Sequence, residues 1–567
     1  MPPRTKRTRH QRRVLFPVKL ASRLTPKQAN MSSAASTSPA PQPSSTSKSP
    51  QPESPITVLG DGNEQNDDND GFVDEEIFVA DAKGFPAHMI PDLYTEPPPI
   101  RDALVTETSR VQDKTVDVCL PYLTGEEDGH LVYNPHGVPS LEREKHIGFL
   151  HKSLGRLPGG FVAADASRPW FLYWALSGLV LLGEDVSSYR EAVIETALSF
   201  QNEQGGFGGG GKQTSHLATT YATVLAIALV GGEEAYEVID RDAMWRWLCS
   251  LKQPDGGFQV CVGGEEDIRG AYCATVIITL LNIPLELTPA SPAREGGLVN
   301  LLAGLGDYVR RCQTYEGGIS GQPNAEAHGA YAFCALGCLS LLDDPRRIFH
   351  RYLNVPRLIT WLSSRQYAPE GGFSGRTNKL VDGCYSHWVG ACFPLIEACL
   401  SPASSGSEPA ETATAAATTT HKLPPASETL FSREGLIRYI LCCCQDETRR
   451  GGLRDKPGKM SDSYHTNYVL AGLSAAQHFW TLSLPLEEPA VPVPPSPEPV
   501  ANPPEWSVLP LYLADGREAG GDDEATAATT LFNQSDRVRP VHPVYALPQE
   551  VVDTIRGYFF IAKEGAL

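Results

Sequence analysis

A turn with two consecutive glycines recurs along the middle of the chain. The Gly pairs begin at residues 205, 256, 317, 371 and 451, at intervals of 51, 61, 54 and 80 residues. Periods of this length are typical of chains built from stacked helical units. A unit that cannot bury its apolar face alone packs on its neighbours, so the turns predict one continuous core shared by the repeats.

Each turn joins two helices of different character. The helix before the second turn is amphipathic, with apolar residues at i, i+3, i+4 and i+7, namely Met244, Trp247, Leu248 and Leu251. Residues 222–229 and 274–283 follow the first two turns and are apolar on nearly all sides, which predicts buried helices. We therefore expect an all-α fold in which five or six helix pairs form a closed α/α ring. Periodicity alone leaves an open solenoid as the alternative.

Polar side chains recur where each predicted buried helix begins. The first polar positions are Ser167, His216, Arg269, His328, Asp382 and His465. Three residues later stand Trp170, Thr219, Tyr272, Tyr331, Tyr385 and Tyr468. Serine and aspartate are good N-caps, whereas histidine and arginine are poor ones, so capping does not account for the four basic positions. If the helices point one way, these groups converge on one rim, as titratable groups of functional sites do.

Two groups of rim residues suggest chemistry. Asp382 and Cys384 are two residues apart, and His465 occupies the same rim. A carboxylate, a thiolate and an imidazole with an open fourth position form the pattern of a catalytic zinc site, although the spacing alone is a weak signal. The run Cys442–Cys444 is predicted to be core helix instead of a ligand set.

The second group is basic. Arg376 and Lys379 precede the metal pair, His328 and Tyr385 come from matching rim positions, and Lys456 and Lys459 add positive charge. The whole chain carries a formal charge of −19, which argues against a nucleic-acid binder, so a local basic cluster needs a reason. A diphosphate is the expected ligand, because cationic and phenolic donors stabilise a leaving oxyanion. A solvated loop is the alternative.

Aromatic residues are predicted beneath the basic group. Either they form a deep funnel or they are core packing, and the set is Trp170, Trp174, Tyr221, Tyr272 and Trp388. An anion pocket above an apolar well matches an isoprenoid diphosphate.

These features together resemble the β subunits of the protein prenyltransferases, and most closely those of the farnesyl-transferring kind. The segments that carry the resemblance are 165–174, the region 376–388, 454–479 and 539–548. The likeness covers residues 95–485 and 535–561 and is far more specific than any single motif. It implies an α/α toroid bound to a separate α subunit as a heterodimer. It also implies zinc-dependent transfer of farnesyl from farnesyl diphosphate to the cysteine of C-terminal C-a-a-X sequences in proteins such as small GTPases.

The resemblance also implies a role for each site residue. One zinc ion per β subunit would be held by Asp382, Cys384 and His465. The diphosphate would meet His328, Arg376, Lys379 and Tyr385, with a magnesium ion held by Asp455. The isoprenoid would be lined by Arg269, Tyr272, Tyr331, Trp388, Trp170 and Tyr221. The peptide would contact Trp170, Trp174, Tyr464, His216, Arg269 and Glu265. Departures from the family pattern stand at His387 and Ser463.

Three alternatives remain at this stage. The β subunit of geranylgeranyltransferase type I is disfavoured by Trp170, since relatives that use the longer prenyl group carry a small residue there. A terpene cyclase is disfavoured because the sequence has neither a D-x-D-D nor a D-D-x-x-D motif. A non-catalytic helical-repeat scaffold that binds peptides would not need Asp382, Cys384 and His465 together.

Composition divides the chain into four parts. Residues 1–75 are predicted to be a disordered tail, and 76–485 the toroid with a low-complexity insertion at 401–428. Residues 486–534 form a Pro-rich linker and variable segment. In 535–567, a helix with Leu547, Val551, Ile555 and Tyr558 on one side is predicted to dock back on the core.

The compartment is inferred from what the sequence lacks. No apolar run reaches the length of about 18 residues that spans a bilayer, and no secretory leader is evident. Thirteen cysteines show no disulfide spacing, so a cytoplasmic location is expected.

Overall fold

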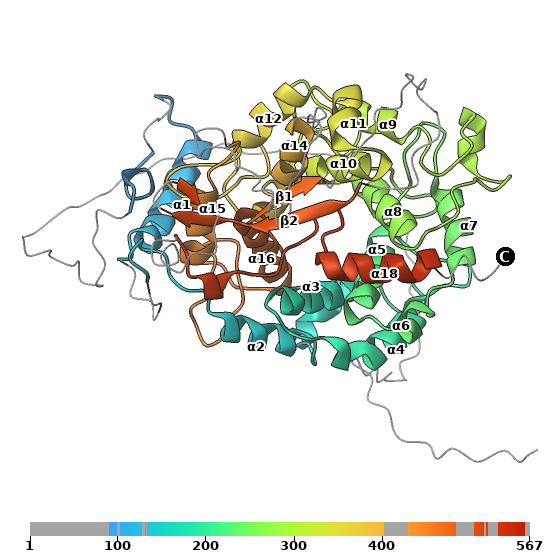
Figure 1. Cartoon of the computed structure of the whole chain (residues 1–567), viewed down its shortest axis with the longest axis horizontal. Coiled ribbons are helices and arrows are strands. Elements are labelled where there is room, and N and C mark those ends of the chain that lie inside the picture. The colour runs from blue at the N-terminus through green and yellow to red at the C-terminus, as the bar shows by residue number, and fades with distance from the viewer. Residues whose placement is uncertain are drawn as a thin grey trace, which may run out of the picture. The chain divides into compact units, whose positions relative to one another are not determined.

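Helical segments from six successive repeats form a closed inner ring in the computed structural model (Figure 1). They are α3 (Arg168–Leu181), α5 (Leu217–Val230), α8 (Ile268–Leu280), α10 (Gly329–Leu342), α13 (Tyr385–Trp388) with α14 (Cys392–Leu400), and α16 (Ser463–Gln477). Each contacts the next, and α16 returns to pack on α3. The last contact closes the ring and excludes the open solenoid, so the predicted α/α toroid is confirmed.

The structure describes residues 90–98, 103–126, 131, 133–401, 429–482, 504–514, 517–519 and 531–561. All of them belong to the same unit of the chain. The predicted disordered tail, residues 402–428 of the predicted insertion and residues 486–503 of the predicted linker lie outside these ranges. No helix within the described ranges is long and apolar enough to cross a membrane.

The inner helices are buried and the outer ones are amphipathic, as the sequence predicts. Every residue of α5 except Ala218 is buried. In α7 (Arg241–Leu251) the stripe Met244, Trp247, Leu248 and Leu251 is buried. The remaining outer helices are α1 (Glu107–Leu123), α2 (Arg143–Ser153), α4 (Arg190–Phe200), α6 (Glu233–Tyr236), α9 (Leu305–Cys312), α11 (Pro345–Tyr352), α12 (Val355–Ser363) and α15 (Arg433–Arg438).

The Gly-Gly turns connect successive outer helices into a second layer around the ring. The first glycine of each pair has φ between 68° and 104°, a conformation that only glycine adopts without strain. A Cβ on each would also lie under 3.0 Å from the backbone of the next outer segment. The partners of Gly205, Gly256, Gly317, Gly371 and Gly451 are Ala243, Gly304, Arg357, Gly435 and Lys145. Lys145 belongs to α2, so the last turn packs the end of the repeat region against the helix that precedes the first inner helix.

The fifth inner segment departs from the regular pattern. Its helix is broken into α13 and α14 at Val389–Ala391. Gly472 of α16 faces Ser386, and a Cβ at this glycine would collide with that serine. The missing side chain lets α13 and α16 approach closely, which sets the geometry of the rim described below.

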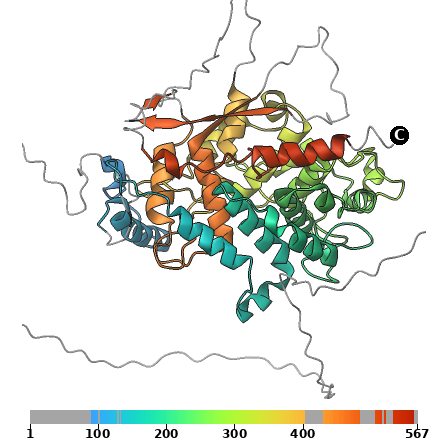
Figure 2. The same ribbon diagram turned by 60° about the horizontal axis from the view of Figure 1, so that its bottom comes forward.

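The C-terminal part covers one end of the ring (Figure 2). Strand β1 (His478–Leu482) pairs antiparallel with β2 (Trp506–Pro510), and β3 (Tyr512–Ala514) pairs with β4 (Arg517–Ala519). These strands were not predicted, and β2 to β4 lie in the segment expected to be a linker. The physical reason is local: β2 pairs its backbone with β1 and buries Trp506, although prolines surround it in sequence.

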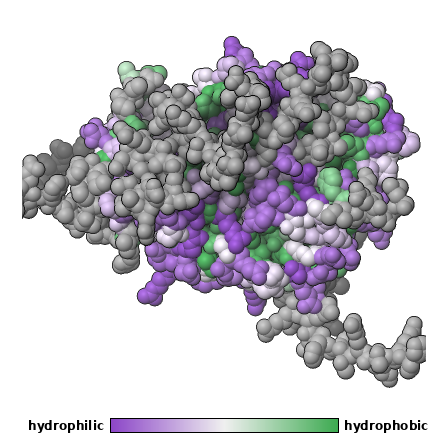
Figure 3. Space-filling view, viewed as in Figure 1, coloured by the Kyte–Doolittle hydropathy of each residue, from purple (hydrophilic) through white to green (hydrophobic). Residues whose placement is uncertain are grey.

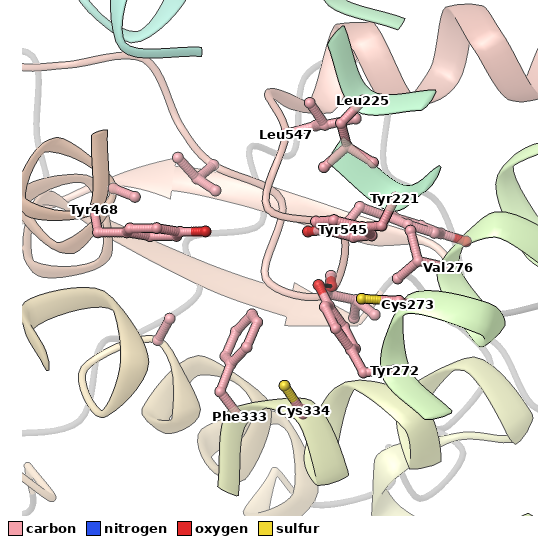
Figure 4. Close-up of a cluster of buried hydrophobic side chains, with 14 of the residues drawn as sticks. Tyr221, Leu225, Tyr272, Cys273, Val276, Phe333, Cys334, Tyr468, Tyr545 and Leu547 are labelled. Atoms are coloured by element: carbon pink, nitrogen blue, oxygen red, sulfur yellow. Dashed lines mark hydrogen bonds between the residues drawn. The ribbon is translucent and has the colours of Figure 1, made fainter. Parts of the chain in front are cut away.

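The chain then returns through residues 541–548 into α18 (Gln549–Ile561), which packs on α5 and α8. Tyr173 and Tyr272 donate hydrogen bonds from their hydroxyls to the carbonyls of Ala546 (2.8 Å) and Val544 (2.7 Å). Figure 4 shows Tyr545 and Leu547 of this segment among side chains of the inner helices. The buried side of α18 is formed by Val552, Ile555 and Phe559, whereas Val551 and Tyr558, which the sequence assigned to it, are half-buried.

The surface needs no special explanation. On the face seen in Figure 3 the described residues are largely hydrophilic, and apolar side chains lie in small groups. Such scattered exposure is normal for a folded protein.

The three cysteines Cys442–Cys444 are fully buried at the end of α15, in and after a π-helical turn, η7 (Tyr439–Cys443). Their predicted role as core residues is confirmed.

Candidate functional site

The carboxyl, thiol and imidazole groups predicted to form a metal site lie together. Asp382 precedes α13, Cys384 is the N-cap of α13, and His465 stands in the first turn of α16. One ligand atom from each lies within 4.8 Å of the others. The close packing of α13 on α16 therefore joins residues from two different repeats at one point of the rim.

A fourth residue, Asp462, orients the imidazole. It is the N-cap of α16, and its Oδ1 accepts a hydrogen bond from the His465 backbone at 2.8 Å. Its Oδ2 lies 2.7 Å from His465 Nδ1. The other ring nitrogen, Nε2, is 3.2 Å from Asp382 Oδ1 but is buried without a hydrogen bond. A carboxylate on one nitrogen and a free second nitrogen is the arrangement of a metal-ligating histidine.

Sequence reasoning assigned no role to Asp462. The signal that could have found it is the spacing: an aspartate three residues before a predicted ligand, at the start of a buried helix, can serve both as the N-cap and as the partner of the imidazole.

Asp382, Cys384 and His465 are called the metal trio below, and their electrostatics fit a bound cation. Cys384 is 4% exposed, and burial, followed by the charge of Asp382, raises the pKa of its thiol well above the usual value. Burial would also raise the pKa of Asp382, but the charge of the His465 ring, 3.2 Å away, lowers it. A divalent ion would offset the cost of a buried thiolate beside a carboxylate. Oxygen, sulfur and nitrogen donors with one open position fit zinc, since magnesium and calcium prefer oxygen ligands alone.

The predicted anion-binding residues lie beside the trio. His328 Nε2 is 3.2 Å from the Tyr385 hydroxyl. Arg376 forms an ion pair with Glu326 at 2.8 Å, and Lys379 is exposed on the same loop. Lys456 is paired with Asp455 at 2.5 Å, and Lys459 is exposed.

The histidines of the rim correct one expectation. His216 and His328 do cap their helices: the Nδ1 of each accepts a hydrogen bond at 3.1 Å, from the backbone of Ala218 and Ala330. The expectation failed because a neutral imidazole has one bare nitrogen, which can accept as a carboxylate does. Burial, and then the charge of Arg376, lower the pKa of His328 to about 4. His328 is therefore neutral, and its Nε2–H donates to Tyr385.

The other rim positions differ from one another. Arg269 does not cap α8; Asp267 does, and it also binds the Arg269 guanidinium. Ser167 stands at the N-cap position of α3 but makes no capping hydrogen bond. Asp382 accepts from the backbone of Cys384 at 2.9 Å, as a local cap would.

The aromatic side chains below the rim form a closed circuit. Consecutive ring centroids are 4.5 to 5.8 Å apart around the circuit, and the members in order are Trp170, Tyr221, Tyr272, Phe333, Trp388, Tyr468, Tyr464 and Trp174. Figure 4 shows four of them, Tyr221, Tyr272, Phe333 and Tyr468, converging from different helices. Phe333 and Tyr468 were not among the predicted funnel residues, and Tyr464 was predicted to meet the peptide instead.

The other predicted site residues lie on the rim or close to the aromatic circuit. The Trp388 indole donates to the Tyr464 hydroxyl at 3.1 Å. The Arg269 guanidinium lies 5.7 Å from the centroid of the Tyr331 ring. Glu265 is exposed on the loop before α8. Asp455 lies next to the trio, because its carbonyl accepts from the Gly383 backbone at 2.8 Å. Burial, followed by the charge of Asp382, raises the pKa of its carboxyl.

Comparison with known proteins agrees with this fold and site. The family described as the prenyltransferase alpha-alpha toroid domain matches residues 141–547. The β subunit of protein farnesyltransferase from Pyricularia oryzae is 55% identical over 84% of this chain and 85% of its own length. That from Schizosaccharomyces pombe is 36% identical over 80% of this chain and 97% of its own. The chain thus belongs to the prenyltransferase toroid proteins and, within them, to the family of protein farnesyltransferase β subunits.

A solved structure supports the fold. The Candida albicans protein geranylgeranyltransferase-I complexed with GGPP superposes with a TM-score of 0.50 over 74% of this chain and 99% of the matched chain. At 18% identity this likeness bears on the architecture alone.

Proposed function

We propose that this chain is the β subunit of a protein farnesyltransferase. It transfers farnesyl, in a zinc-dependent reaction, from farnesyl diphosphate to the cysteine thiol of C-terminal C-a-a-X sequences. The observation that carries the proposal is the convergence of Asp382, Cys384 and His465 within 4.8 Å, directly beside the aromatic circuit. Family membership supplies the reaction class.

Asp382, Cys384 and His465 hold the zinc ion in this proposal, and Asp462 fixes the His465 ring. A zinc ion at this position would lower the pKa of a substrate thiol and so supply a thiolate near neutral pH. Cys384 is a ligand and not the nucleophile, since it is 4% exposed and burial raises the pKa of its thiol.

The basic group binds the diphosphate and stabilises its departure. Transfer forms a carbon–sulfur bond at C1 of the farnesyl group and breaks the C1–oxygen bond, so negative charge grows on the diphosphate. Arg376 and Lys379 supply full charges, and His328 and Tyr385 supply neutral hydrogen-bond donors. The raised pKa of Asp455 is consistent with a place for a magnesium ion, which would offset the crowding of the Asp382 and Asp455 carboxylates.

The aromatic circuit accommodates the prenyl chain and the peptide. Tyr221, Tyr272, Tyr331, Trp388 and Arg269 line the isoprenoid. In this proposal Trp170, whose ring stacks on that of Trp174 with centroids 5.5 Å apart, is the floor of the well and selects farnesyl over the longer geranylgeranyl group. Trp174, Tyr464 and Trp170 meet the C-terminal tetrapeptide, and His216, Arg269 and Glu265 help to orient its end.

The partner and the compartment follow from the same assignment. The enzyme is a heterodimer with an α subunit, and the acceptors are C-a-a-X proteins such as small GTPases. All thirteen cysteines are free, and many unpaired thiols are typical of a reducing compartment such as the cytoplasm.

The test is prenyl transfer by the chain co-expressed with a cognate α subunit. Farnesyl diphosphate and geranylgeranyl diphosphate are each offered with a C-a-a-X peptide, and zinc content is measured on the same samples. Cys384→Ala is compared with Cys399→Ala, a matched control, since both cysteines are 4% exposed. We expect farnesyl transfer and bound zinc to be lost in Cys384→Ala and retained in Cys399→Ala.

The other outcomes separate the alternatives. A preference for geranylgeranyl would retain the metal mechanism and reject the chain-length argument from Trp170. A folded, zinc-loaded heterodimer that transfers neither group would reject the enzyme and favour a peptide-binding scaffold.

A further inference from the structure

A threonine stands between the two cations of the proposed anion site, Arg376 and Lys379. The Oγ1 of this residue, Thr377, accepts a hydrogen bond from Arg365 Nη1 at 3.0 Å and donates one to Glu316 Oε2 at 2.8 Å. The direction of both bonds is fixed, because a guanidinium only donates and a carboxylate only accepts. One hydroxyl therefore ties the loop to two charged side chains from other segments.

The partners of Thr377 rest on a buried support. Arg365 is 6% exposed, and its Nε donates to the Trp361 carbonyl at 3.2 Å. The Arg365 guanidinium also lies 4.9 Å from the centroid of the Trp361 ring. Trp361, a buried residue of α12, donates from its indole to Glu316 Oε2 at 3.3 Å. The two partners of the hydroxyl are thus joined to each other through one tryptophan of the outer layer.

The other contacts of the loop hold it less firmly. The ion pair of Arg376 with Glu326 joins side chains that are 39% and 57% exposed, and exposed pairs contribute little. The Arg376 carbonyl accepts from the Lys379 backbone at 3.3 Å, a bond within the loop itself. Asn378 has a φ of 58°, a conformation that residues other than glycine seldom adopt. A turn of this kind persists where its surroundings fix it, and Thr377 is its immediate neighbour.

The charges of the network suit a position beside an anion. Arg365 and Glu316 carry opposite charges, and the Thr377 hydroxyl bridges them. The network therefore adds no net charge next to the diphosphate, and it leaves Arg376 and Lys379 as the cations of this loop. Cations that are held in place before a ligand arrives bind it more tightly, because less freedom is lost on binding.

We propose that Thr377 is a positioning residue for the diphosphate of the prenyl donor. Its hydroxyl fixes the loop, and so fixes the two cations on either side of it, without belonging to the set that contacts the ligand. The inference rests on the proposed binding of diphosphate by Arg376 and Lys379, and it adds the interaction that prepares them.

The test is ligand binding and prenyl transfer by the chain in complex with its α subunit. Thr377→Val removes the hydroxyl and keeps the shape of the side chain, whereas Thr377→Ser keeps the hydroxyl. The control is Thr360→Val, because Thr360 is an exposed residue of α12 whose hydroxyl donates to the Pro356 carbonyl at 3.0 Å. The dissociation constants of farnesyl diphosphate and inorganic diphosphate are measured by titration calorimetry, and KM is measured for each substrate.

In Thr377→Val we expect both dissociation constants to rise by about 3- to 10-fold, the equivalent of one hydrogen bond. The KM for farnesyl diphosphate should rise with them, whereas the KM for the C-a-a-X peptide should stay the same. Thr377→Ser and Thr360→Val should bind both ligands as the wild type does. A purely structural role would not confine the effect to the diphosphate-bearing ligand.

A further variant separates this inference from the proposed function. Arg376→Ala should weaken the binding of inorganic diphosphate if the anion site is correct. Weaker binding in Arg376→Ala together with wild-type binding in Thr377→Val would overturn the role of Thr377 alone. A loss in Thr377→Ser as large as in Thr377→Val would also overturn it, since the hydroxyl would then not be the cause. Wild-type binding in Arg376→Ala would contradict the anion site itself and the inference with it.

Discussion

Asp462 has two roles at the candidate metal centre: it caps α16, and it contacts the imidazole of His465. Substitutions at this position can separate the two roles. Asp462→Asn keeps an N-cap of equal quality for α16, but it replaces the carboxylate that lies 2.7 Å from His465 Nδ1 with a neutral amide. Loss of such a partner lowers metal affinity by about 10- to 100-fold, which corresponds to about 1.4 to 2.7 kcal/mol. The metal-free chain should lose no more than about 1 kcal/mol, the value of a partly exposed ion pair.

Zinc affinity is measured by chelator competition on the heterodimer, and the unfolding free energy by denaturant titration of the metal-free form. Asp240→Asn is the control, because Asp240 caps α7 by accepting from Ala243 at 2.9 Å and lies outside the trio. Asp462→Ala should lose the same zinc affinity and, in addition, about 1 kcal/mol for the missing cap. Wild-type zinc affinity in Asp462→Asn would refute the assignment of His465 as an oriented ligand.

Three further predictions concern chain length, folding and pH. Trp170→Ala should raise geranylgeranyl transfer relative to farnesyl by more than about tenfold, measured as a ratio of kcat/KM values; an unchanged ratio would reject Trp170 as the floor. Gly371→Ala should cost at least about 2 kcal/mol of unfolding free energy, since φ is 78° and a Cβ would meet Gly435, whereas Gly159→Ala meets nothing within 4 Å and should cost little. Burial lowers the pKa of His146 to about 4 while the unfolded chain titrates near 6.5, so stability should fall from pH 6.5 towards 4, by up to about 3 kcal/mol for this group; His146→Gln should flatten that slope, and an equal slope in both proteins would contradict the buried neutral state.

The repeat architecture could be predicted because the residues that mark each unit, the glycines of the turns, are required for a single structural reason. The first glycine of each turn is required by a positive φ and by an outer segment packed against it, so the turns mark the units directly. Closure could not be read from the period. It depends on α16 meeting α3 and on Gly451 meeting Lys145, contacts between distant parts of the chain that no local pattern contains.

The strands and the terminal helix show where local patterns fail. Pairing of β1 with β2 joins residues on the two sides of a Pro-rich segment, and the composition of that segment predicts a linker. For α18 the helix was predicted from its period and Ile555 is buried as expected, but Val552 and Phe559 are buried in place of Val551 and Tyr558. The position of α5 and α8 decides which side is covered.

The sequence predicted which residues lie on the rim but not which hydrogen bonds each of them makes. Sequence reasoning treated capping and function as alternatives, whereas His328 caps its helix and contacts Tyr385 at the same time. Its Nδ1 accepts from Ala330, which forces the proton onto Nε2 and makes that nitrogen a donor towards Tyr385. Asp462 likewise has two contacts, since it caps α16 with one oxygen and orients His465 with the other. The helix N-terminus therefore sets the tautomer of His328 and the orientation of His465. A substitution that keeps the capping hydrogen bond but removes the contact with the neighbouring side chain tests the function of the site without unfolding the helix.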